Sequence, residues 1–148
     1  MAAAAARATT ISVATYRDDP LYPRIERAVA AILATGKVVT PVDVLVRMGL
    51  LAPDRIEQWR RGRIAYLEQV IDGNLTRLSR LLRILRFHAH ELNLVPSVTI
   101  YVSEGTCRRQ RLRFTKSGQA AIEEAYARHF VWPGKGPFPA PGPEEVPE

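Results

Sequence analysis

Three observations on the sequence predict a mainly α-helical fold with one β-hairpin. Apolar residues recur at helical spacing over most of residues 20–95, and the spacing changes to a strand-like alternation after Pro96. Proline and glycine stand where the helical segments are expected to start and stop. We therefore expect helix-turn-helix-like N-terminal helices, a long leucine-rich helix, a basic hairpin and a C-terminal helix.

The N-terminal half is predicted to contain several short helices. Thr40 is the expected N-cap of the second, which has Pro41 at its first position and Gly49 as its stop. Ile56 and Trp59, three residues apart, form the apolar side of the third. The predicted helices span about residues 23–35, 41–49, 53–62 and 64–71.

The longest predicted helix spans residues 74–92. At about 100° per residue, Leu75, Leu78, Leu82 and Leu85 gather in one sector, and Ile84 lies outside it. The apolar surface is larger than one neighbouring element would cover. The helix is therefore expected either at the centre of the core or in the interface of a homodimer.

Residues 97–115 are predicted to form the hairpin. Apolar and polar residues alternate over 98–102 and again over 111–115, and residues 103–106 between them supply turn chemistry. A last helix is expected from residue 117 to about 130.

We expect a single domain over residues 20–131. Residues 1–19 are small and polar, which predicts a disordered leader, although the same composition is loosely similar to a transit peptide. Residues 132–148 are rich in proline and glycine, which predicts a disordered tail. No stretch approaches the roughly 18–20 uninterrupted apolar residues that cross a bilayer, so no membrane partner is expected.

Positive charge is concentrated in the middle of the chain. Residues 55–116 hold thirteen basic and five acidic side chains, which gives this segment a net charge of +8. The net charge of all 148 residues is +6, so the rest of the chain is slightly acidic. Eighteen of the twenty-one basic residues are arginine, whose flat guanidinium binds phosphate and guanine edges in a bidentate manner. The charge therefore indicates a polyanionic partner.

Residues 42–63 resemble a helix-turn-helix motif of the winged-helix kind. Leu45 takes the buried position of the first helix, Gly49 the turn, and Ile56 and Trp59 the inward face of the second. The resemblance implies that the second helix enters the major groove of DNA while the first crosses the backbone. Alternation in the hairpin puts Arg109, Arg111 and Arg113 on one face, as in a wing that contacts phosphate.

The predicted function is therefore DNA binding, as in a transcriptional regulator, without catalytic residues. Two alternatives stay open: an interaction adaptor that uses the arginine-rich surface and the proline-rich tail, and an RNA-binding protein, for which exposed aromatic residues are scarce. The residues expected to contact DNA are Arg55, Gln58, Arg60, Arg61, Arg63, Arg108, Arg109, Arg111, Arg113 and Lys116.

Neither a metal site nor a cofactor is expected. His88 and His90 lie about 200° apart on a helix and cannot bind one ion together. Further ligands would have to come from His129 or Cys107, and His88 is predicted to be a hydrogen-bonded core residue. Cys107 is the only cysteine, which excludes an internal disulfide and fits a cytoplasmic or nucleoid-associated location.

Overall fold

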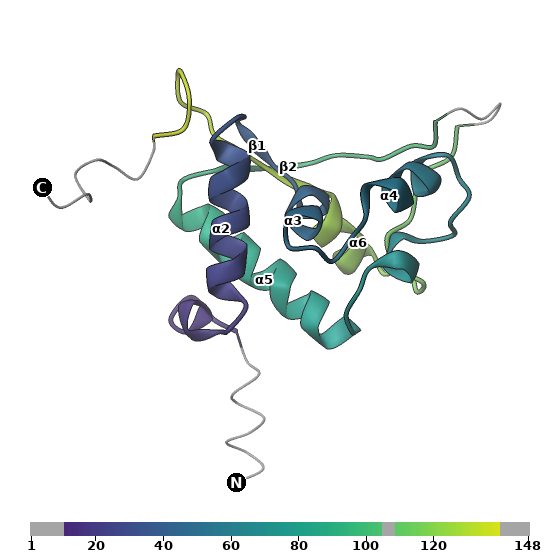
Figure 1. Ribbon diagram of the computed structural model, residues 1–148, viewed down its shortest axis with the longest axis horizontal. Helices are drawn as coiled ribbons and strands as arrows, with labels where there is room; N and C mark the ends of the chain where they lie inside the picture. Colours follow the sequence, from purple (N-terminus) through teal and green to yellow (C-terminus); the bar gives the residue numbers. More distant parts are fainter. Residues whose placement is uncertain (1–10, 105–108, 140–148) are drawn as a thin grey trace, which may run out of the picture.

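A computed structural model describes residues 11–104 and 109–139 of the chain. The expected predominance of helix is confirmed, and α2 and α4 lie at opposite ends of the folded part (Figure 1). Writing η for a 3-10 helix, the elements are η1 (Tyr16–Asp18), α2 (Tyr22–Leu33), β1 (Val38–Val39), α3 (Pro41–Arg47), α4 (Pro53–Arg60), η2 (Leu67–Val70), α5 (Leu75–Glu91), β2 (Val95–Val98), α6 (Ala120–Ala127) and β3 (Arg128–Val131).

The boundaries of α3 follow from local chemistry, as predicted. The hydroxyl of Thr40 accepts a hydrogen bond from the backbone N–H of Asp43 at 3.0 Å, and Pro41 occupies the first helical position. Gly49 ends the segment with a φ of +77°, a conformation that a side chain disfavours. The helix predicted over residues 64–71 is wrong, because this segment contains only the short 3-10 helix η2.

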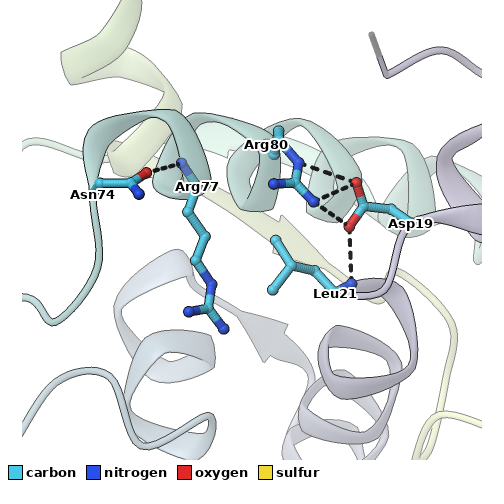
Figure 2. Close-up of polar contacts among 5 residues, drawn as sticks. All are labelled: Asp19, Leu21, Asn74, Arg77 and Arg80. Atoms are coloured by element: carbon cyan, nitrogen blue, oxygen red, sulfur yellow. Dashed lines mark hydrogen bonds and ion pairs between the residues drawn. The ribbon is translucent and has the colours of Figure 1, made fainter. Parts of the chain in front are cut away.

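Helix α5 is central to the hydrophobic core. The side chain of Asn74 caps it by accepting a hydrogen bond from the N–H of Arg77 at 2.7 Å (Figure 2). Leu78, Leu81 and Ile84 are fully buried, whereas Leu75 is 64% exposed. Leu78 and Leu85 of the predicted apolar sector are buried as expected, whereas the prediction is wrong for Leu75. Ile84, which was placed outside that sector, belongs to the same core, to which α2 and η1 also contribute.

The strands form one antiparallel sheet in the order β1-β3-β2, so the prediction that a single hairpin over 97–115 makes up the β structure is wrong. Strand β2 pairs with β3, with Val95 opposite Val131 and Val98 opposite Arg128. The local alternation placed the first strand at residues 98–102, whereas β2 begins earlier and ends at Val98, and the alternation did not predict the partner β3. The predicted last helix also ends early, since α6 stops at Ala127 and the chain continues directly as β3.

Residues 11–19 pack against the body of the protein, although a leader without structure was predicted there. Tyr16 is buried, and the buried carboxylate of Asp19 accepts three hydrogen bonds of 2.8–3.1 Å from the guanidinium of Arg80 on α5 (Figure 2). The same carboxylate accepts the N–H of Leu21 at 2.9 Å. This pair attaches the N-terminal segment to the core.

Residues 132–139 also contact the body, within the region predicted to be a disordered tail. The rings of Trp132 and Phe138 meet edge to face at 5.0 Å, and Lys37 donates a hydrogen bond to the carbonyl of Gly134 at 2.9 Å. None of the helices in the described ranges is long and apolar enough to cross a membrane.

Candidate nucleic-acid interface

Helix α4 presents the first group of predicted contact residues. Only Trp59 is fully buried on this helix, and Ile56 is half-buried against the core beside it. Arg55, Arg61 and Arg63 are exposed, and Gln58 and Arg60 are half-buried. The predicted orientation of Trp59 toward the core is thus confirmed, and the arginines lie outside as expected.

The second group lies on an extension that joins β2 to α6, which we call the arm (residues 99–104 and 109–115). Its two halves run antiparallel: Ser103 N–H donates to the carbonyl of Gln110, and Leu112 N–H donates to that of Tyr101, each at 2.8 Å. Val102 and Arg111 form the bridge between the halves. The predicted contact residue Arg108 lies outside the described residues.

The alternation predicted for the second half of the arm is confirmed. Leu112 and Phe114 are buried, with 8% and 2% exposure, whereas Arg109, Arg111 and Arg113 are exposed. A strand that packs one face on the core and leaves the other in water produces this pattern. The arm therefore carries cationic side chains on its solvent side.

The fold brings α4 and the arm together. The indole N–H of Trp59 donates to the carbonyl of Arg113 at 2.8 Å, and the N–H of Glu104 donates to the carbonyl of Arg60 at 2.6 Å. The N–H of Leu67 adds a second hydrogen bond to the Arg113 carbonyl at 3.1 Å. Two segments about fifty residues apart in sequence are thus hydrogen-bonded side by side.

Aromatic packing supports this junction from beneath. The ring of Trp59 lies 5.0 Å from that of Phe114 and 5.6 Å from that of Tyr101, and Phe114 stacks on Tyr126 of α6 at 5.2 Å. Aromatic pairs at such distances add stability beyond the area that they bury. The arm is therefore held to α4 and α6 by side chains as well as by backbone hydrogen bonds.

The carboxylate of Glu123 on α6 fixes the base of the arm. It accepts hydrogen bonds from the N–H of Phe114 at 3.0 Å and from the N–H and hydroxyl of Thr115 at 2.8 and 2.6 Å. Thr115 is 2% exposed, so these hydrogen bonds are shielded from water.

The exposed arginines differ in how far they are already engaged. Arg60 pairs with Glu104 at 3.4 Å and Arg61 with Glu57 at 2.7 Å, and these solvent-exposed pairs are weak. Four others make no ion pair within residues 11–104 and 109–139: Arg55, Arg63, Arg109 and Arg111. We call the side chains of these four, with Gln58, Arg60 and Arg61, the α4–arm surface.

Two predicted contact residues are placed differently. Arg113 turns its guanidinium back and donates hydrogen bonds to the carbonyls of Thr115 and Lys116. The side chain of Lys116 lines a groove between α5 and α6 instead of the α4–arm surface. Both differences arise because the chain bends at residues 115–118 to enter α6.

The tyrosines near the surface are neutral at physiological pH. Burial raises the pKa of Tyr101 to about 12, against the opposing effect of the nearby Arg60 guanidinium. Burial and the hydrogen bond of 2.7 Å to the carboxylate of Glu68 raise the pKa of Tyr126 as well. Neither phenol therefore adds negative charge beside the arginines.

Within the described ranges, no three histidine, cysteine or acidic side chains are grouped so that they could hold a metal ion. His88 is buried with its ring at 5.4 Å from that of Tyr22, and its Nδ1 has no hydrogen-bond partner among the described residues. The prediction of a core histidine is confirmed, but the expected hydrogen bond is absent at that nitrogen. Burial lowers the pKa of His88.

The sequence interpretation missed Arg83 and Arg86 as a pair. Both are exposed and line the groove between α5 and α6, together with Arg128 of β3. Their spacing of three residues on α5 was a signal that they share a face. Arg128 joins them only through the pairing of β3 with β2, which the local pattern did not predict.

Comparison with family models, with curated proteins and with solved structures found no match for this chain.

Proposed function

We propose that this protein binds duplex DNA through the α4–arm surface. The observation that supports it best is the junction between α4 and the arm, where Trp59 and Arg60 hydrogen-bond to Arg113 and Glu104. The junction joins two cationic segments into one surface that follows an extended polyanion better than either segment would. Arginine is also the side chain best suited to phosphate and guanine.

The order of the elements is consistent with the winged-helix resemblance of residues 42–63. The sheet order β1-β3-β2 places the strand that follows the arm between the other two, and the arm joins β2 to β3 by way of α6. In this proposal the arm acts as the wing and contacts phosphates, while α4 supplies Gln58 and arginines for base edges.

Duplex DNA is favoured over single-stranded RNA because Tyr101 and Phe114, the aromatic residues in the described part of the arm, pack against other rings. Single-stranded RNA is usually bound on exposed aromatic rings. Tyr101 packs among Trp59, Phe114 and His129. A location with the nucleoid or in the cytoplasm accords with this proposal.

The first experiment measures the affinity for nonspecific duplex DNA as a function of salt by fluorescence anisotropy. The four arginines without an ion pair and the two in weak surface pairs would give about four to six phosphate contacts, so the logarithm of affinity should fall with the logarithm of salt with a slope of roughly −4 to −5. Affinity should drop by about two to three orders of magnitude between about 50 and 200 mM salt.

The second experiment locates the surface with matched variants. The double variant Arg63→Ala, Arg111→Ala should reduce the salt slope by about 2, because each phosphate contact contributes about 0.9. Arg27→Ala is the control, since Arg27 is exposed on α2 at the far end from α4 (Figure 1). Absence of binding at about 50 mM salt would refute DNA binding. Equal effects of the control and the double variant would refute this surface, and tighter binding to RNA would favour the RNA-binding alternative.

A further inference from the structure

A groove of about 900 Å³ separates α5 from α6 on a different surface from the α4–arm surface. Its floor is apolar and includes Leu75, which is 64% exposed, and Ile122, which is 37% exposed. Leu82 and the small side chains of Ala121 and Ala125 complete it. Exposed apolar area rimmed by polar side chains is typical of an interaction site.

The rim of the groove is cationic. Arg83 and Arg86 are exposed on α5 and make no ion pair within the described residues, and Lys116 lies on the opposite side. The rim also holds two carboxylates: Glu124 pairs with Arg128 at 3.7 Å, and Glu68 accepts the hydroxyl of Tyr126 at 2.7 Å. Because the basic side chains of the rim outnumber these carboxylates, its net charge is positive.

The groove continues into a second cavity along α5. A second cavity of about 390 Å³ shares Arg86, Arg128 and Phe130 with it and extends to His90. The lining residues therefore follow α5 from Leu75 to His90, a length of about 22 Å at about 1.5 Å per residue. About four turns of a second helix would fill this length.

We propose that the groove binds an amphipathic helix of a partner protein that carries acidic residues beside its apolar stripe. The apolar stripe packs on Leu75, Leu82 and Ile122, and the carboxylates pair with Arg83 and Arg86. This is the helix-in-groove mode of recognition, in which apolar anchors recur at about every third or fourth residue.

A second copy of the chain fits the groove less well. Arg83 stands at the middle of α5 (Leu75–Glu91), so a twofold axis through that helix would bring the Arg83 side chains of both copies together. Juxtaposed like charges disfavour such a pairing. Duplex DNA fits less well too, because hydrated phosphates would lie against the exposed leucine and isoleucine.

The proposal is tested with the full chain and a displayed library of 18-residue amphipathic helices. All members carry the same leucine stripe, and the positions flanking it vary among Glu, Gln and Lys. Selection should enrich Glu over Lys at those positions, and a chosen acidic peptide should bind at least about tenfold more tightly than its Lys counterpart. A scrambled peptide of equal composition should bind no better than background.

The charge-reversed variant Arg83→Glu, Arg86→Glu supplies the decisive comparison. Both residues are exposed, so the variant is expected to fold, and its preference should switch from the acidic to the Lys peptide. Its affinity for duplex DNA should stay close to that of the unchanged chain, which separates this groove from the α4–arm surface. The proposal would be overturned if the variant kept the preference for the acidic peptide. It would also be overturned if selection with the unchanged chain enriched Glu and Lys equally at the flanking positions.

Two further results would assign the groove to another occupant. If DNA displaces the acidic peptide, the groove is a nucleic-acid surface. If the chain sediments as a dimer that Leu75→Arg converts to a monomer, a second copy covers the groove.

Discussion

The ion pair between Asp19 and Arg80 makes a sharp prediction about stability. The Asp19 side chain is 6% exposed and that of Arg80 28% exposed, and three hydrogen bonds of 2.8–3.1 Å join them. Removal of one partner from a buried pair costs about 3–5 kcal/mol, because the other charge stays buried without compensation. Arg80 keeps some contact with water, so Asp19→Ala should cost about 3 kcal/mol, near the lower end of that range.

The loss of the hydrogen bond from Leu21 N–H adds to this effect. That bond is 2.9 Å long and buried, and its removal costs about 1 kcal/mol. Urea unfolding of Asp19→Ala should therefore show a loss of about 3–4 kcal/mol. Asp18→Ala is the matched control: Asp18 is exposed and makes no ion pair within the described ranges, so its change should stay within about 0.5 kcal/mol.

A double-mutant cycle separates the ion pair from the hydrogen bond that Asp19 accepts from Leu21 N–H. Arg80→Met keeps much of the apolar stem, and the double variant Asp19→Ala, Arg80→Met should be more stable than the sum of the single losses predicts. The expected coupling is about 2 kcal/mol. A coupling below about 0.5 kcal/mol would mean that the pair behaves as a solvated surface contact, and the anchoring of residues 11–19 by this pair would be refuted.

Three further changes have expected outcomes. Trp59→Phe removes the indole N–H that holds the arm, so it should cost about 1 kcal/mol in urea unfolding and weaken DNA binding without removing a cation; unchanged DNA affinity would show that the junction does not organise the surface. Because burial lowers the pKa of His88 from 6.5, the unfolded chain takes up a proton first, and stability should fall as pH drops below about 6.5 toward that lowered pKa, by up to about 1.4 kcal/mol per pH unit. His88→Gln should lose this part of the pH dependence, and an identical profile would contradict the assignment. Gly49→Ala should destabilise by about 1–2 kcal/mol because its φ is +77°, whereas Gly36→Ala has ordinary space and a permitted φ and should be nearly neutral.

Local signals in the sequence predicted the helices well. The start of α3 depends on Thr40 and Pro41, and its end on Gly49, all within a few residues of the helix that they define. The exposed face of the arm was predictable for the same reason, since alternation of Leu112 and Phe114 with arginines is a property of adjacent residues.

Pairing between distant segments could not be predicted in this way. The alternation after Pro96 identifies a strand, but a period of two does not say which strand lies beside it. The partner of β2 is β3, which follows α6 and was expected to be part of a helix. Asp19 presents the same problem: its burial requires Arg80, sixty-one residues further along the chain.

The same distinction between local and long-range information applies to the candidate site. Composition and alternation indicated which arginines face solvent, but the junction of α4 with the arm depends on the indole of Trp59 reaching the carbonyl of Arg113. The groove between α5 and α6 was not predicted either, because its cationic rim combines Arg83 and Arg86 of α5 with Arg128 of β3.

The two proposed surfaces differ in the physical character of binding, so one set of titrations distinguishes them. Contacts of the α4–arm surface with phosphate release counterions, which requires a steep dependence on salt. The groove buries Leu75 and Ile122, which requires a negative heat-capacity change and a shallower dependence on salt. If DNA and the acidic helix bind independently, each affinity stays constant when the other ligand is saturating. If each ligand weakens the other without displacing it at saturation, reciprocity requires equal losses for both ligands, and the arm and α6, joined by Phe114 and Tyr126, would be the connection to examine first.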